Sequence, residues 1–237
     1  MRYQVYRSIL RQPAARPLFR FQQLQRNMSA EPRIVRPALF VCDLQERFQK
    51  AIYNFPAVVA TTRKLLSVAS ILSVPVYATT QNKRALGDTV PELLEHFPKD
   101  AVVADKTLFS MCVPEVLDKL DEKATVTIVG IESHICVLQT TLDLLERGHK
   151  VYVIRDGVSS CNPQEIPTAL ARMQQSGAII TTSESWLFEL MRDSSRPEFK
   201  AIATLVKENK QLTKECLEAL VGGMDASGMS SDCAKIF

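Results

Sequence analysis

Six short apolar runs, each followed by a segment with apolar residues at helical spacing, constrain the fold of this chain most. Short runs rich in β-branched residues are typical of strands, and apolar residues three and four positions apart are typical of one face of a helix. The expected strands are 34–42, 74–80, 101–104, 125–131, 151–154 and 178–181. The expected helices are 55–72, 90–96, 114–120, 135–147, 163–175, 184–191, 198–206 and 214–221.

Strands that alternate with helices at this cadence indicate parallel βαβ units. The strands are apolar almost throughout, which is expected when helices cover both faces of a sheet. The sequence therefore predicts a doubly wound α/β fold. We expect one folded domain at 32–206, preceded by a leader at 1–31 and followed by a C-terminal helix and flexible tail at 207–237.

The leader differs in charge from the rest of the chain. Its first 27 residues hold six arginines and no acid, so of the 29 basic side chains 23 remain against 26 acidic ones. The remainder is slightly acidic, and we expect no nucleic-acid partner. An Arg-rich, acid-free leader is typical of a mitochondrial transit peptide, which would make the protein mitochondrial. The alternative is translation from Met28 and a cytoplasmic product.

The six cysteines include no Cys-x-x-Cys pair and no repeated spacing. That pattern argues against a disulfide framework and a structural zinc site, and favours a reducing compartment. The sequence shows no apolar run near the roughly 20 residues that span a bilayer, so we expect no membrane segment.

Candidate chemistry lies where predicted strands end. Cys136 follows a strand and lies in or near the first turn of the next helix, where unpaired N–H groups and the helix dipole favour a thiolate. Asp43 and Lys106 follow two other strands, and the carboxyl ends of parallel strands share one rim of the sheet. Each residue has an ordinary alternative: buried packing for Cys136, a turn former for Asp43, a surface charge for Lys106. His134 fits a turn histidine better than a base, which leaves Asp43 as the base.

Three ordered motifs carry a family resemblance: Asp-Leu-Gln at 43–45, Lys-Thr-Leu-Phe-Ser-Met at 106–111 and Gly-Ile-Glu-Ser-His-Ile-Cys-Val at 130–137. With these motifs the chain resembles the isochorismatase-like cysteine hydrolase superfamily over about residues 32–206. The resemblance implies a six-stranded parallel sheet in the order 3-2-1-4-5-6. It also implies a triad in which Cys136 is the nucleophile, Asp43 the general base and Lys106 the stabilising cation.

The resemblance further implies a cis peptide bond between Ile131 and Glu132, which would aim N–H groups such as that of Cys136 at an oxyanion. Relatives that hydrolyse nicotinamide bind a metal after the second strand, but here that stretch reads Thr-Thr-Gln-Asn-Lys at 79–83. We therefore expect no metal and no cofactor, and a small amide, imide or ester as substrate. The weaker pocket candidates, all near the three motifs, are Gln45, Phe48, Gln81, Asn82, Phe109 and Ile135.

Two other functions stay open. The chain could be a non-catalytic scaffold of the same fold that binds a protein partner. Alternatively, Cys136 could be a redox-sensing thiol, although no resolving cysteine stands at a readable spacing. We also expect a homo-oligomer.

Overall fold

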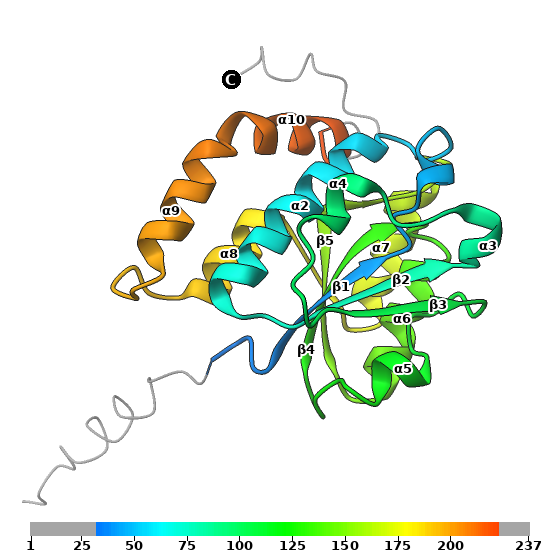
Figure 1. The fold of residues 1–237 in the computed structure, drawn as a ribbon, viewed down its shortest axis with the longest axis horizontal. Helices are drawn as coiled ribbons and strands as arrows, with labels where there is room; N and C mark the ends of the chain where they lie inside the picture. Colours follow the sequence, from blue (N-terminus) through cyan, green and yellow to red (C-terminus); the bar gives the residue numbers. More distant parts are fainter. Residues whose placement is uncertain (1–31, 223–237) are drawn as a thin grey trace, which may run out of the picture. The chain divides into compact units, whose positions relative to one another are not determined.

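A parallel sheet of six strands forms the centre of the fold (Figure 1). The computed structural model describes residues 32–222. The strands lie in the order β3-β2-β1-β4-β5-β6, which confirms the predicted order. Their bounds are β1 Pro37–Cys42, β2 Val76–Gln81, β3 Val102–Lys106, β4 Thr125–Ile131, β5 Lys150–Ser159 and β6 Ile179–Thr181.

Helices cover both faces of this sheet, as the apolar strands predict (Figure 1). Helices α2, α8, α9 and α10 lie on one face, and α5, α6 and α7 lie on the other. Two hydrophobic cores result: one contains Leu39, Val41 and Trp186, and the other contains Phe40 and Ile128. The bounds are η1 Glu46–Phe48, α2 Phe55–Leu72, α3 Lys83–Leu86, α4 Pro91–Leu94, α5 Pro114–Leu117, α6 Cys136–Glu146, α7 Glu165–Gln175, α8 Ser183–Met191, α9 Phe199–Glu208 and α10 Lys210–Leu220.

The helices predicted at 90–96 and 114–120 are each three residues shorter than expected, and the strand predicted at 151–154 is six residues longer. After α4 and α5 the backbone N–H groups bond to carbonyls three residues back, so the chain continues as tight turns rather than as α-helix. β5 extends past the predicted end at Ile154 through Asp156 and Gly157, residue types that are depleted in strands. There β5 shifts register against β4, and the Asp156 carboxylate accepts hydrogen bonds from Ser183.

The domain does not end at residue 206, where the sequence suggested a boundary. That point falls inside α9, and α10 packs on α2 and β5. The Asn54 side chain on the loop before α2 donates to the carbonyl oxygen of Ala219 at 2.8 Å. Both C-terminal helices therefore belong to the domain that holds the sheet. The expected leader at 1–31 and the tail from residue 223 onward lie outside the described residues.

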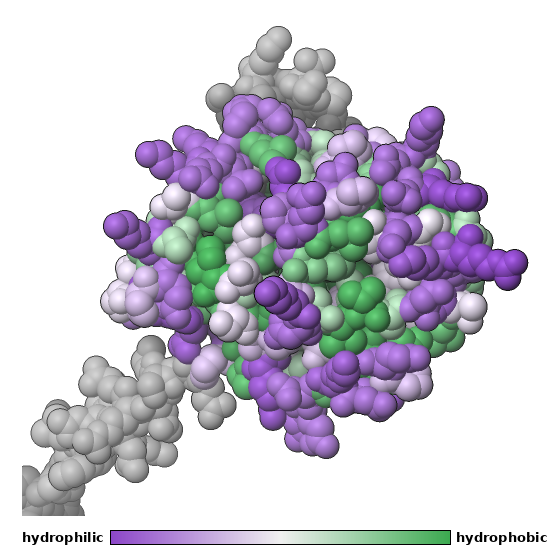
Figure 2. Space-filling view, viewed as in Figure 1, coloured by the Kyte–Doolittle hydropathy of each residue, from purple (hydrophilic) through white to green (hydrophobic). Residues whose placement is uncertain are grey.

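Helix α2 has the length and apolar composition of a membrane-spanning helix, with a mean hydropathy of 1.3. Half of it is buried inside the domain, where it contacts β5 and α10, so we interpret it as a core helix. The face that includes α2 carries hydrophilic side chains over most of its area, with smaller hydrophobic areas between them (Figure 2). A water-facing surface has this character.

Candidate active site

The polar residues predicted from the strand ends do lie at the carboxyl end of the sheet. Lys106 ends β3, Asp43 directly follows β1, and Cys136 begins α6 after β4. Strand β2 lies between β3 and β1, and it contributes Thr79 and Gln81 from its C-terminal half. In open α/β sheets this rim is where ligands bind.

Lys106 and Asp43 form a buried ion pair. The Lys106 Nζ lies 2.8 Å from the Asp43 Oδ2, and their side chains are 0% and 2% exposed. The same Nζ donates to the Gln81 Oε1 at 2.8 Å and to the Phe109 carbonyl oxygen at 3.0 Å. All three ammonium protons therefore have an acceptor, which is what keeps a buried lysine charged.

The groups around Lys106 shift its pKa. Burial by itself lowers this pKa, but the interactions of Lys106 with Cys42, Asp43 and Cys136 outweigh burial and raise the pKa above its ordinary 10.5. Lys106 is thus a fixed cation that faces two thiols and a carboxylate. A cation in this position stabilises a thiolate.

Asp43 is held in place by its neighbours on β2. The Thr79 hydroxyl donates to Asp43 Oδ1 at 2.8 Å, and the Asp43 N–H donates to the Thr79 carbonyl oxygen at 3.2 Å. The Asp43 backbone is left-handed, with φ at 53°, which turns the chain away from the strand direction. Both carboxylate oxygens therefore have partners, and the carboxylate has a defined orientation.

The nucleophile candidate Cys136 lies beside a second cysteine. Cys136 is 5% exposed and Cys42 is fully buried, in the same hydrophobic core. The pKa of Cys42 is raised well above 9.0, first by a side-chain hydrogen bond with Cys136, then by burial and by the charge of Asp43. The Cys42 thiol also lies 3.6 Å from the Asp43 Oδ2. The two thiols, the carboxylate and Lys106 are therefore one connected group.

Gly130 allows the ends of β1 and β4 to pair closely. It pairs with Cys42 across β1 and β4, and a Cβ atom added at Gly130 would lie 2.2 Å from the Cys42 carbonyl oxygen. Its φ of 131° is also one that side chains rarely adopt. Only glycine lets these two strand ends come so close.

The expectation of a cis peptide bond at Ile131–Glu132 is wrong, since no cis peptide bond occurs within residues 32–222. The chain instead leaves β4 through a left-handed Glu132 with φ at 57°. A left-handed residue costs about 1–2 kcal/mol, less than the roughly 3–4 kcal/mol of a cis bond before a residue other than proline. The sharp turn into α6 is therefore made by a φ angle.

The pocket candidates separate into two groups. Gln81 and Phe109 contact Lys106 as described above, and Phe109 is 49% exposed. Ile135 is partly buried against the core that contains Cys136, and Asn82 donates its backbone N–H to the Lys106 carbonyl oxygen at 2.8 Å. These four residues lie around the candidate site.

Gln45 and Phe48 have other surroundings. Gln45 is fully buried, and its side chain donates to the carbonyl oxygens of Gln81 and Gly87 and accepts from the Gln81 N–H. Its amide group thus holds the end of β2 in place. Phe48 packs against the core on the α2 side of the sheet, whereas Cys136 belongs to the other core.

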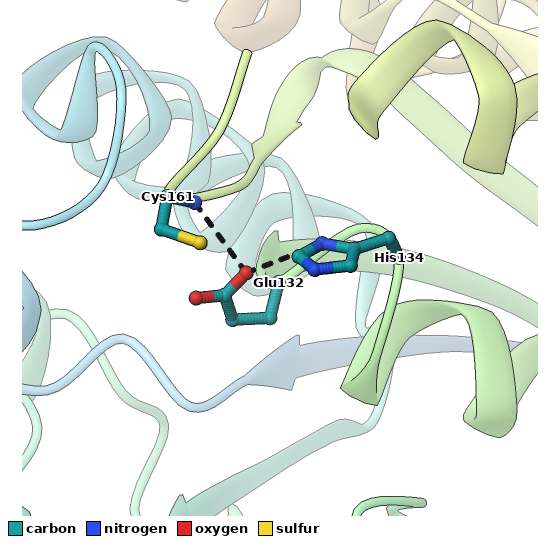
Figure 3. A group of neighbouring side chains, drawn as sticks. All are labelled: Glu132, His134 and Cys161. Carbon is teal, nitrogen blue, oxygen red and sulfur yellow. Dashed lines mark hydrogen bonds and ion pairs between the residues drawn. The ribbon is translucent and has the colours of Figure 1, made fainter. Parts of the chain in front are cut away.

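His134 makes the contacts of a turn residue. Its Nδ1 lies 3.0 Å from the Ser160 Oγ and 3.4 Å from the Glu132 Oε2. The Cys161 N–H also donates to Glu132 Oε2, at 3.4 Å (Figure 3). These contacts join the turn after β4 to the loop after β5.

Sequence reasoning missed two members of the site, Cys42 and Thr79. Cys42 reads as the last apolar residue of a strand, and Thr79 as an ordinary β-branched strand residue. The signal that could have found Thr79 is register, because Thr79 pairs with Cys42 across β1 and β2 and so lies beside Asp43. That register cannot be read from either strand alone.

The fold and the polar rim of the sheet define a doubly wound α/β protein with a candidate site at the strand ends, and comparison with known proteins specifies the family. The isochorismatase domain model matches residues 37–185, and the chain belongs to this family. A Phytophthora sojae protein named secreted isochorismatase effector Isc1 is 46% identical over 178 residues, 72% of this chain and 84% of that protein.

Two further relatives support the assignment. Human isochorismatase domain-containing protein 2 is 44% identical over 173 residues, 72% of this chain and 82% of that protein. The solved structure of the MAR1 ribonuclease from Caenorhabditis elegans is 45% identical, with a TM-score of 0.70, over 75% of this chain and 91% of that one. The chain therefore has the fold of isochorismatase-family hydrolases.

Proposed function

We propose that the protein is a cysteine hydrolase that cleaves a small amide, imide or ester through an acyl-thioester on Cys136. The observation that carries this proposal is the buried Lys106–Asp43 pair, at 2.8 Å, connected to Cys136 through Cys42. A buried ion pair is a poor way to gain stability, since apolar residues of similar volume serve as well or better. A catalytic role accounts for its presence.

In the proposed reaction Asp43 accepts the thiol proton of Cys136, and the thiolate attacks the substrate carbonyl carbon. The tetrahedral intermediate collapses, the leaving amine or alcohol takes the proton from Asp43, and the acyl group stays on sulfur. Water then gives a proton to Asp43 and attacks the thioester, and the thiol of Cys136 is restored. Asp43 is the base in both halves of the reaction, Cys136 is the nucleophile in the first half and water is the nucleophile in the second.

Two features of the chain would lower the barrier to these steps. Lys106 keeps its charge throughout, so it stabilises the Cys136 thiolate while Asp43 is protonated. Cys136 is the first residue of α6, a helix of 11 residues, so its own N–H, at the positive end of the helix, would donate to the developing oxyanion. Ile131 and Glu132 set the direction of that turn.

The contact between Cys42 and Cys136 favours redox sensing as a second candidate function. The sequence had suggested no resolving cysteine, and Cys42 fits that role. Hydrogen peroxide would transfer a hydroxyl group to the Cys136 thiolate and leave as hydroxide. Asp43 would then take the proton of the Cys42 thiol, and the Cys42 sulfur would attack the sulfenic sulfur of Cys136 to form a disulfide. The hydroxide that leaves would take the proton back from Asp43 and depart as water.

Thiol labelling tests the hydrolase proposal directly. Full-length protein is treated with iodoacetamide at pH 6–9, and labelled sites are identified by peptide mass. We expect Cys136 to be alkylated at neutral pH faster than Cys161, which is exposed and serves as an internal reference. Asp43→Asn and Lys106→Met should each slow Cys136 by at least about tenfold, and Lys99→Met, an exposed lysine, should not.

A substrate screen then separates catalysis from mere reactivity. Small amides, imides and esters are offered to the wild type and to Cys136→Ala, with a short RNA included because the C. elegans relative is named a ribonuclease. Turnover that depends on Cys136 supports the hydrolase. Ordinary Cys136 reactivity, unchanged by the two substitutions, would contradict it and leave the scaffold function. The homo-oligomer, the small-molecule or protein partner and the mitochondrial location stay predictions.

A further inference from the structure

A second group of reactive side chains lies beside the candidate active site. Glu132, His134 and Cys161 offer one carboxylate oxygen, one imidazole nitrogen and one sulfur, all within 4.8 Å of one another (Figure 3). Glu132 and His134 follow β4, and Cys161 lies two residues after the end of β5. Because β4 and β5 are neighbours in the sheet, their ends bring these three residues together.

We propose that Glu132, His134 and Cys161 bind a divalent transition-metal ion of the zinc type, with a fourth position open to water. Thiolate sulfur, imidazole nitrogen and carboxylate oxygen are the three donors that zinc takes in proteins. Calcium and magnesium prefer oxygen ligands alone, so a set that includes sulfur selects against them. One carboxylate and one thiolate also balance the two charges of the ion.

Part of this group already has the spacing of metal ligands. Bonds of about 2.0–2.3 Å in tetrahedral geometry place two ligand atoms about 3.3–3.8 Å apart. The His134 Nδ1 lies 3.4 Å from the Glu132 Oε2. The Cys161 N–H donates to the same carboxylate, and the Cys161 sulfur lies within 4.8 Å of the ligand atoms of Glu132 and His134.

Metal binding would replace one existing contact and release one proton. The His134 Nδ1 now lies 3.0 Å from the Ser160 Oγ. The metal ion would replace this hydroxyl as the partner of the nitrogen. The Cys161 thiol would lose its proton to water as the sulfur–metal bond forms. The ion would then join the turn after β4 to the loop after β5 more firmly than the present hydrogen bonds do.

The turn concerned leads to Cys136. The carbonyl oxygen of Glu132 accepts the N–H of Ile135 at 2.9 Å and the N–H of Val137 at 3.2 Å. A metal ion on the Glu132 side chain would therefore fix the residues that precede and follow Cys136. This inference does not depend on the proposed hydrolase, since the three ligands differ from Cys136, Asp43 and Lys106.

Cobalt(II) tests the site because a cobalt–thiolate bond gives a charge-transfer absorption in the near ultraviolet. Full-length protein, first stripped with a chelator, is titrated with cobalt and then with zinc as competitor. We expect the band to form in the wild type, in Cys136→Ala and in Cys233→Ser, and to be displaced by zinc. Cys161→Ser should abolish the band.

Two further variants test the other ligands. His134→Ala and Glu132→Gln should each weaken zinc binding by at least about 100-fold, because even outer-shell partners of a metal ligand are worth 10–100-fold. Unfolding midpoints confirm that each variant is folded, and Cys161 is exposed, so its replacement leaves the core intact. A wild type without the band, or a band that persists in Cys161→Ser, would overturn the proposal. Loss of the band in Cys136→Ala instead would place the metal on the nucleophile and overturn it equally.

Discussion

The buried ion pair makes a sharp prediction for stability. Lys106→Met keeps the length of the side chain but removes its charge, which leaves the Asp43 carboxylate 2% exposed without its cation. Removing one member of a buried pair costs about 3–5 kcal/mol, because the remaining charge stays desolvated. For a domain of this size that loss lowers the melting temperature by about 6–20 °C. Urea unfolding followed by far-UV circular dichroism measures it.

The double variant Asp43→Asn/Lys106→Met decides whether the charge is the cause. Without the carboxylate the unpaired charge is gone, so the double variant should be more stable than Lys106→Met alone by at least about 2 kcal/mol. Lys99→Met should match the wild type, because Lys99 is exposed. The prediction is refuted if Lys106→Met lowers the free energy of unfolding by less than about 1 kcal/mol. It is refuted equally if the free-energy losses of the two single variants add up to that of the double variant.

The same pair predicts a response to alkali. The folded pKa of Lys106 is raised above 10.5, so its contribution to stability is fully present below pH 10.5 and is lost as the pH rises through the folded pKa. We expect the wild type to lose stability in that window more steeply than Lys106→Met does. Equal slopes in the two proteins would contradict this assignment.

Two other predictions concern Lys64 and Cys42. Lys64→Met removes hydrogen bonds to Ser183 and Thr213, at 2.8 and 2.9 Å, and should cost about 1–3 kcal/mol by urea unfolding. Burial lowers the pKa of Lys64, so the wild type should gain stability as the pH rises toward 10.5, and the variant should lack this gain. For the redox candidate, hydrogen peroxide should give a dithiothreitol-reversible Cys42–Cys136 disulfide, whereas Cys42→Ser should stop at a dimedone-reactive sulfenic acid. Identical products from both proteins would exclude Cys42 as the resolving thiol.

The architecture could be predicted because local patterns and global fold agree. Apolar runs such as 125–131 cannot satisfy their backbone groups or cover their side chains except in a sheet with helices on both faces. The same pattern marks the strand ends, which is why the sequence alone assigns Asp43 and Lys106 to one rim of the sheet. Strand prediction clearly fails at β5, because Asp156 and Gly157 are residue types that indicate a loop. In the structure Ser183 donates two hydrogen bonds to the Asp156 carboxylate, which the sequence does not reveal.

What the sequence could not supply are contacts that depend on register between strands. The close pairing of Cys42 with Gly130 joins β1 to β4 across more than eighty residues of sequence. The meeting of Glu132 with Cys161 likewise depends on where β5 ends. The cis bond expected before Glu132 came from resemblance alone, and the chain makes the turn by another means.

At position 132 the backbone favours glycine for thermal stability, whereas the proposed metal site needs the carboxylate of Glu132. Glycine would adopt its φ of 57° without the steric cost of a Cβ, about 1–2 kcal/mol. A library of this protein selected only for survival at high temperature should therefore enrich Glu132→Gly. Each such winner would have lost the carboxylate that faces His134 and Cys161, so thermal selection and retention of this side chain pull the sequence in opposite directions.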